Sequence, residues 1–193
     1  MQSTIVDLIR HGEPQGGSMY RGHNIDDPLS EKGWQQMWHA VNDNNHWQQI
    51  ISSPMLRCEE FAQQLSDKHD IPLQIENDFK EVGFGAWEGL TRDQVKQKNI
   101  DEYNNFYLDP VSNRPESFEP LDNFINRVTQ TYEKVIKQYE NQHILIVAHA
   151  GVIRALLAYI VYAPAKGIYN FKINNAGVSQ IDASSRDIIF INQ

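Results

Sequence analysis

Two short apolar runs, each ending directly on a histidine, constrain the fold of this chain most strongly. Residues 4–9 (Thr-Ile-Val-Asp-Leu-Ile) lead into Arg10-His11-Gly12, and residues 143–148 (His-Ile-Leu-Ile-Val-Ala) lead into His149-Ala150-Gly151. Runs of this length and composition are typical of strands that are covered on both faces. Both segments therefore predict buried strands of a largely parallel sheet, each followed by a sharp turn.

The remaining segments alternate between strand and helix patterns. We expect further strands at 47–52, 71–75, 178–181 and 188–191, and helices at 30–41, 54–65, 118–139 and 152–160, with residues 42–45 ending the first helix. This alternation predicts an α/β fold: a three-layer sandwich with a mostly parallel central sheet and helices on both faces.

The length of the chain predicts one domain. A single core usually covers about 100 to 200 residues, and this chain has 193 residues, of which 40% are hydrophobic. Residues 91–108 predict one or two polar helices and residues 110–120 a loop. We expect residues 1–193 to form a single domain, within which 91–120 could form a small helical lid.

Charge and cysteine content exclude several classes of partner and compartment. The chain has 17 Lys and Arg against 25 Asp and Glu, a net charge of -8, which disfavours binding to nucleic acid. Cys58 is the single cysteine, so no internal disulfide is expected. The first ten residues lack the pattern of a signal peptide, and no apolar run approaches the roughly 20 residues of a membrane span. We therefore expect a soluble, cytoplasmic protein that does not bind membranes.

Two of the seven histidines are candidates for chemistry. Ligands of open α/β sheets bind beyond the carboxyl ends of the strands, and His11 and His149 each follow a predicted buried strand. Their imidazoles should therefore point into one crevice, although either alone could be a histidine whose polar atoms are satisfied by the backbone. Polar or helical surroundings indicate a surface or packing role for the others: His23, His39, His46, His69 and His143.

Two arginines suggest that this crevice holds an oxyanion. Arg10 precedes His11, and Arg57 lies in the first turn of the helix expected after the second strand. Guanidinium groups match phosphate oxygens and stay charged at every relevant pH, and the start of a helix adds N–H donors. The alternative for Arg57 is a solvated surface position.

One carboxyl group is a candidate general acid. Glu81 lies in the Gly- and aromatic-rich stretch 79–89, where apolar rings and a nearby anion would favour its neutral form. It could then give a proton to a leaving oxygen. Glu81 could instead cap the helix expected at Thr91 or face water, and Glu88 in the same loop competes for the role.

Four segments, in order along the chain, resemble the motifs of the histidine phosphatase superfamily, whose fold is phosphoglycerate mutase-like. They are Leu-Ile-Arg-His-Gly-Glu at 8–13, Ser-Ser-Pro-Met-Leu-Arg at 52–57, Glu-Val-Gly-Phe-Gly-Ala-Trp-Glu-Gly at 81–89, and Val-Ala-His-Ala-Gly-Val-Ile-Arg at 147–154. One Arg-His-Gly tripeptide would be weak evidence, but four ordered segments are specific.

The resemblance implies a role for each candidate residue. His11 is expected to be the nucleophile that forms a phosphohistidine, and Glu81 the proton donor to the departing alcohol. Arg10, Arg57 and a protonated His149 are expected to clamp the phosphate. Because these groups can neutralise the developing charge, we expect no metal and no cofactor. No His-Glu-x-x-His helix or Cys pair with metal-ligand spacing occurs.

The chain departs from the family pattern at several positions. Pro14 and Gly17 replace the Thr and Asn that often follow the first motif, and Ala150 replaces a glycine after the second histidine. Residues 20–30 resemble a family stretch of the form Gly-x-x-Asp-x-Pro-Leu, from which we expect Arg21 and His23 to face the substrate.

The resemblance implies a small-molecule phosphomonoester as the substrate. The chain looks shorter than the family's mutases, and it is similar to the α-ribazole phosphatase group, which acts in cobalamin synthesis. The alternatives are a broad-specificity sugar or nucleotide phosphatase, a phosphoglycerate mutase-like enzyme and, in another class, a catalytically dead protein that binds phosphorylated ligands. The sequence leaves the oligomeric state open, a homodimer included.

Overall fold

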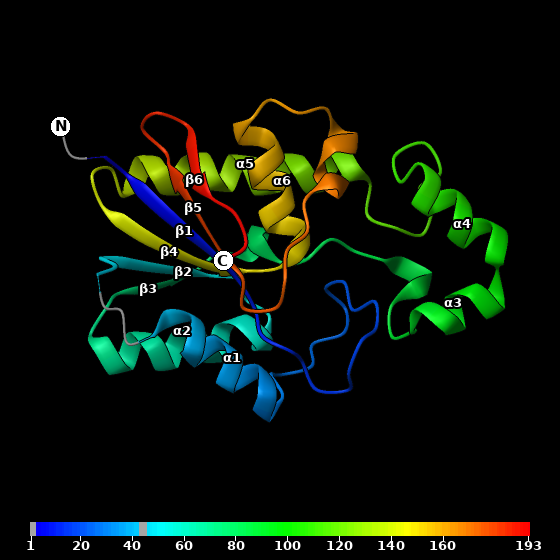
Figure 1. The fold of residues 1–193 in the computed structure, drawn as a ribbon, viewed down its shortest axis with the longest axis horizontal. Coiled ribbons are helices and arrows are strands. Elements are labelled where there is room, and N and C mark those ends of the chain that lie inside the picture. Colours follow the sequence, from blue (N-terminus) through cyan, green and yellow to red (C-terminus); the bar gives the residue numbers. More distant parts are fainter. Residues whose placement is uncertain (1–2, 43–45) are drawn as a thin grey trace.

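A six-stranded sheet forms the centre of the molecule (Figure 1). The computed structural model describes residues 3–42 and 46–193, so the expected helix end at 43–45 lies outside the described residues. The strand order is β3-β2-β4-β1-β5-β6. The strands are β1 (Ile5–Arg10), β2 (Gln49–Ser52), β3 (Leu73–Ile75), β4 (His143–Ala148), β5 (Val178–Asp182) and β6 (Asp187–Phe190).

The first four strands of that order are parallel, whereas β5 and β6 are antiparallel to their neighbours. The expected α/β fold with a mostly parallel sheet is therefore confirmed. The two antiparallel strands come from the C-terminal segment, where a short polar turn joins β5 to β6 and leaves no room for a crossover helix.

Every connection between consecutive strands except that from β5 to β6 contains at least one helix. The helices are α1 (Glu31–Val41), α2 (Leu56–His69), α3 (Arg92–Lys98), α4 (Ile100–Leu108), α5 (Leu121–Gln138) and α6 (Ala150–Ile160), with 3-10 turns η1 (Asn77–Phe79), η2 (Gly85–Trp87) and η3 (Ala165–Asn170). Ser30 caps α1 by accepting a hydrogen bond from the Gly33 N–H at 3.0 Å. Asn42 ends α1 in the left-handed conformation, with φ of 43°.

Successive residues of the central strands contribute to two apolar clusters, one on each face of the sheet. Val6, Leu8 and Ile146 pack with α5 and α6, while Ile9 and Val147 pack with α1 and α2. In Figure 1, α1 and α2 lie on one side of the strands and α5 and α6 on the other. Strands buried on both faces explain why their sequences are continuously apolar.

A third apolar cluster supports α3 and α4, which Figure 1 shows at one end of the molecule, away from the sheet. Trp87, Val95, Phe106 and Phe118 form its buried part. Phe118 lies in this cluster and not in the long helix, so α5 begins three residues later than its apolar period predicts. The prediction of one or two helices at residues 91–108 is confirmed, because α3 and α4 occupy this segment.

The pairing of β1 with β4 places the two histidine motifs side by side. Arg10 is the partner of Ala148 in this parallel register, and the His11 N–H donates to the Ala148 carbonyl at 2.9 Å. His11 and His149 therefore leave the sheet at the carboxyl ends of adjacent strands. Among the described residues, no helix combines the length and apolar character needed to cross a bilayer.

Candidate active site

The rings of His11 and His149 lie next to each other. Their centroids are 5.2 Å apart and their planes are inclined at 62°. Both residues are buried, with exposed fractions of 5% and 0%. The expectation that the two imidazoles converge is confirmed, and its cause is the parallel register of the strands that carry them.

The backbone fixes the tautomer of His11. Its Nδ1 lies 2.7 Å from the Gly12 carbonyl oxygen, which can only accept a hydrogen bond, so Nδ1 carries the proton. Burial, followed by the charges of Arg57 and Arg10, holds the pKa of His11 well below its usual value. The ring is therefore neutral near pH 7, and its Nε2 carries a free lone pair.

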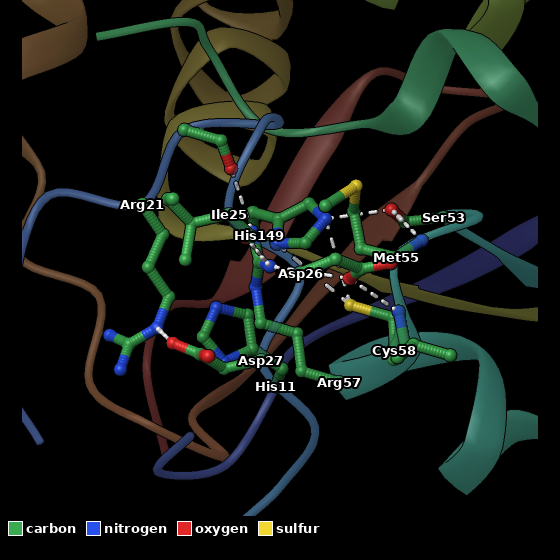
Figure 2. Close-up of polar contacts among 12 residues, drawn as sticks. His11, Arg21, Ile25, Asp26, Asp27, Ser53, Met55, Arg57, Cys58 and His149 are labelled. Atoms are coloured by element: carbon green, nitrogen blue, oxygen red, sulfur yellow. Dashed lines mark hydrogen bonds and ion pairs between the residues drawn. The ribbon is translucent and has the colours of Figure 1, made fainter. Parts of the chain in front are cut away.

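A hydroxyl group and a thiol contact the imidazole ring of His149. Ser53 Oγ lies 2.7 Å from its Nε2, and Cys58 Sγ lies 3.7 Å from the same nitrogen (Figure 2). Burial and the charge of Arg57 also hold the pKa of His149 well below its usual value. The protonated His149 expected from the sequence is therefore disfavoured while no phosphate is present. The contact of Ser53 with His149 could not be predicted from the sequence, because a serine before a proline gives no signal of it.

Arg57 is a buried cation with one unused donor. Its side chain is 1% exposed, and it donates from Nη1 to the Ile25 carbonyl at 3.1 Å and from Nη2 to the Gly22 carbonyl at 2.9 Å. Its Nε is buried without a hydrogen-bond partner among the described residues. The solvated alternative for Arg57 is wrong, because the first turn of α2 lies beneath the loop that contains Gly22 and Ile25.

Arg10 has the same combination of an anchored end and a free donor. Its Nη1 donates to the Ile173 carbonyl at 2.8 Å, while its Nε is buried and unpaired within the described part of the chain. A buried donor without a partner is costly. Two of them from two guanidinium groups indicate a site that an anion completes.

Glu81 lines the same cavity as His11. Its Oε1 accepts from the Val82 N–H at 2.9 Å and its Oε2 from the Gly151 N–H at 3.2 Å. The first turn of α6 thus orients the carboxyl group. Thr91 itself caps α3, in a capping box with Gln94, so the capping alternative for Glu81 does not apply.

The carboxylate of Glu88, the competing candidate, binds backbone N–H groups of two loops. Its Oε1 accepts from the Phe84 N–H at 2.8 Å and its Oε2 from the Asn24 N–H at 3.3 Å. It is not among the residues that line the cavity. Gly22, with φ of 56°, has no room for a side chain because the Glu88 carboxyl occupies that space.

Arg21 and His23 lie in different places. Arg21 lines the cavity, but its Nε donates to Asp27 Oδ2 at 2.8 Å (Figure 2). Its Nη2 donates to the Gln15 and Gly17 carbonyls. His23 is not a lining residue. Its Nδ1 donates to the Glu81 carbonyl at 2.9 Å, which places it behind the acid loop.

The cavity itself has a volume of about 270 Å³ and two kinds of wall. Its charged and titratable lining residues include Arg10, His11, Arg57 and Glu81, whereas His149 lies against the His11 ring and is not itself a lining residue. Apolar and aromatic side chains make up much of the rest of the lining: Met19, Tyr20, Phe84, Leu121, Phe124, Ile168 and Tyr169. The sequence gives no signal of this apolar lining or of the nearby Arg154, because the lining residues come from separate loops and helices with no shared spacing.

The arrangement suits the transfer of a phosphoryl group. Two guanidinium groups and buried N–H donors can hold a tetrahedral dianion, the lone pair of His11 Nε2 is available to attack it, and Glu81 is positioned to exchange a proton with the departing oxygen. The apolar wall would then contact the rest of the substrate.

Comparison with known proteins agrees with this arrangement. The sequence model of the histidine phosphatase superfamily (branch 1) matches residues 6–190. The chain is 27% identical over 183 residues to an adenosylcobalamin/alpha-ribazole phosphatase of Escherichia coli, covering 93% of this chain and 90% of that protein. It is 26% identical over 182 residues to phosphoserine phosphatase 1 of Hydrogenobacter thermophilus, covering 93% and 86%. The crystal structure of the alpha-ribazole phosphatase from Shigella flexneri matches with a TM-score of 0.85 and 26% identity, over 98% of this chain and 96% of that one.

Proposed function

The chain belongs to the histidine phosphatase superfamily and is a phosphatase, and on this basis we propose that it hydrolyses phosphomonoesters without a metal, through a phosphohistidine at His11. The observation that carries the proposal is the state of His11. Its Nδ1 proton is bound to the Gly12 carbonyl, so Nε2 presents a lone pair beside two guanidinium groups that have unpaired donors.

In the first step, the lone pair of His11 Nε2 forms a bond to phosphorus as the bond to the ester oxygen breaks. Arg10, Arg57 and His149 hold the phosphoryl oxygens, and protonated Glu81 gives its proton to the departing alkoxide. The alcohol leaves, and His11 carries the phosphoryl group.

In the second step, water attacks the phosphohistidine. The Glu81 carboxylate takes a proton from that water as the phosphorus–nitrogen bond breaks, and the electron pair of this bond returns to Nε2. Inorganic phosphate is released and Glu81 is again protonated. Because His149 is buried and flanked by arginines, it acts in this scheme as a neutral N–H donor that Ser53 positions.

We propose α-ribazole 5'-phosphate as the substrate because of the apolar wall. A nucleoside-like alcohol presents a flat aromatic surface, which can pack on side chains such as Tyr20, Phe84 and Tyr169. Phosphoserine and phosphoglycerate are small and charged, and they would leave most of this wall uncovered. The similarity to alpha-ribazole phosphatases of two organisms supports the same choice.

A panel of phosphomonoesters, assayed with excess chelator, tests both parts of the proposal. We expect turnover to survive the chelator, and we expect kcat/KM for α-ribazole 5'-phosphate to exceed the values for phosphoserine and 3-phosphoglycerate. Loss of turnover with the chelator would contradict the metal-independent mechanism. Similar kcat/KM values across the panel would instead support the broad-specificity phosphatase, whose substrates the apolar wall would hold without selection.

We also propose that the whole chain acts as one domain in which α3 and α4 form a lid. Tyr20 lines the cavity, and its hydroxyl group lies 2.6 Å from that of Tyr107 on α4. We expect Tyr107→Phe to raise KM for α-ribazole 5'-phosphate and to leave KM for the smaller p-nitrophenyl phosphate unchanged. Equal effects on both substrates, or no effect on either, would contradict the lid.

A further inference from the structure

A second cluster of ligand-type side chains lies at the opposite end of the sheet from the phosphate pocket. Asp7 lies on β1, His143 begins β4, and His46 precedes β2. His143 and His149 are six residues apart along one strand, which corresponds to roughly 20 Å. We infer that Asp7, His46 and His143 bind a divalent transition metal ion of the zinc class.

The three side chains converge on one point. His143 Nε2 lies 2.9 Å and His46 Nε2 lies 3.6 Å from Oδ2 of Asp7, and one ligand atom from each residue lies within 4.8 Å of the others. Ligands bound to zinc at about 2.0 Å in a tetrahedron lie roughly 3.3 Å apart. The two distances to Oδ2 of Asp7 therefore differ from this spacing by only a few tenths of an ångström, and all three ligand atoms lie close enough for the half-exposed His46 to complete the set by a side-chain adjustment.

The carboxylate is held in place by groups outside the cluster. Trp47 Nε1 donates to Oδ2 of Asp7 at 2.7 Å, and Gln180 Nε2 donates to Oδ1 at 2.9 Å. The side chain of Asp7 is only 5% exposed. Fixed outer partners of this kind orient the ligands of known metal sites and strengthen binding.

Hydrogen bonding alone does not explain the position of His46. Oδ2 of Asp7 already accepts from Trp47 and His143, and a carboxylate oxygen offers about two lone-pair sites. The His46 nitrogen points at the same oxygen from 3.6 Å, beyond hydrogen-bond distance. Its ring also lies near that of His143, with centroids 4.5 Å apart and planes tilted by 35°. A cation between the three ligand atoms would satisfy them together.

The ligand types select the class of metal. Two imidazoles with one carboxylate suit Zn²⁺, Co²⁺, Ni²⁺ or Cu²⁺, whereas Mg²⁺ and Ca²⁺ prefer sites made of oxygens. Binding requires each Nε2 to present its lone pair, so a proton at Nε2 must move to Nδ1 or to water as the metal bond forms. His46 is 44% exposed, which gives the ion a path of entry and leaves a coordination position for water.

The sequence could not show this site. Its three ligands stand at positions 7, 46 and 143, without the short regular spacing of metal motifs, and the surroundings of His46 and His143 in the sequence indicate surface or packing residues. Such a metal would tie the segment before β2 to β1 and β4. It lies far from His11, so it would stabilise the fold without taking part in phosphoryl transfer.

The test is titration of untagged, chelator-treated protein with Zn²⁺ by calorimetry, and with Co²⁺ by visible absorption. We expect one ion per chain, the d–d bands of a tetrahedral cobalt site, and a higher Tm. His46→Gln and His143→Gln should each weaken binding by at least about tenfold. His46 is partly exposed, so its replacement should leave the fold intact. His39→Gln, at an exposed histidine of α1, is the matched control and should bind normally.

Zinc bound at the phosphate pocket gives a different pattern. It would persist in His46→Gln and His143→Gln but would be lost in His11→Gln, which should retain binding if the ion lies at Asp7. Absence of binding, or equal affinity in all four variants, would overturn the inference. Phosphatase activity of His46→Gln should match that of the wild-type chain, so failure of the metal site and failure of the proposed function are distinguishable.

Discussion

The carboxyl group of Glu81 occupies the space that a side chain on Gly151 would need. A Cβ at Gly151 would overlap Glu81 Oε1, while the Gly151 N–H donates to Oε2 at 3.2 Å. The glycine thus lets the first turn of α6 approach the acid loop and hold the carboxyl group by its backbone. The position of the proton donor therefore depends on a residue that carries no side chain.

Replacing this glycine should displace the acid. We expect Gly151→Ala to push the Glu81 side chain away from the cavity and to lower kcat/KM for esters of poorly acidic alcohols by about 10²-fold or more, the usual contribution of a general acid. The measurement is steady-state kinetics of Gly151→Ala, Glu81→Gln and the double variant. If the fold-loss in the double variant is the product of the two single fold-losses, the glycine does not act through Glu81.

Glu81→Gln should discriminate between leaving groups. An alkoxide of high pKa needs a proton as it departs, whereas p-nitrophenolate leaves without help. We expect kcat/KM, which reports the steps up to departure of the alcohol, to fall about 10²- to 10⁴-fold for an alkyl phosphate and far less for p-nitrophenyl phosphate. Equal losses for the two substrates would show that Glu81 is not the proton donor.

Arg57→Ala should weaken both the ground state and the transition state. The Arg57 guanidinium is buried beside both histidines and has a free Nε donor. We expect a higher KM, a lower kcat and a loss in kcat/KM of about 10²- to 10³-fold, similar to the removal of one oxyanion donor. Arg186→Ala, in the turn between β5 and β6, is the control. An unchanged KM with a lower kcat would mean that Arg57 contacts only the transition state.

The two buried histidines should make stability depend on pH. Folding lowers the pKa of both His11 and His149, so below about pH 6.5 the unfolded chain binds protons that the folded chain does not. The free energy of unfolding should therefore fall as the pH decreases from about 6.5 towards the folded pKa values. Each histidine contributes a slope of about 1.4 kcal/mol per pH unit in that window.

Urea unfolding between about pH 5.5 and 7.5 measures this slope. His11→Gln and His149→Gln each remove one titrating imidazole and should each reduce the slope below pH 6.5 by about 1.4 kcal/mol per pH unit. Above that pH the variants should show no change in slope from this source. A wild-type slope that neither substitution reduces would contradict the neutral state assigned to the two rings.

Much of the fold could be predicted because its central strands are apolar on both faces. The runs at β1 and β4 indicated parallel strands, and their shared register brought His11 and His149 together. The start of α5 was wrong by three residues, since Phe118 continues the apolar period but packs in a different cluster. Periodicity records that a residue is buried and not which element it is buried against.

The site could be predicted only where its chemistry follows a strand or a motif. Arg10, Arg57 and Glu81 came from the sequence, whereas the support of His149 by Ser53, the aromatic wall and the Asp7 cluster did not. Each of these depends on contacts between segments far apart in the chain. His23 shows the converse, because its motif placed it at the substrate while its ring holds the Glu81 backbone.

The central claim is that His11 carries the phosphoryl group, and trapping of the intermediate tests it most directly. The chain is mixed with a ³²P-labelled phosphomonoester, quenched rapidly in alkali and digested, and the labelled peptide is identified. We predict a phosphate that is stable in alkali and labile in acid, attached to His11 and absent from His11→Gln. Turnover without such a label, or a label on another residue, would contradict the account.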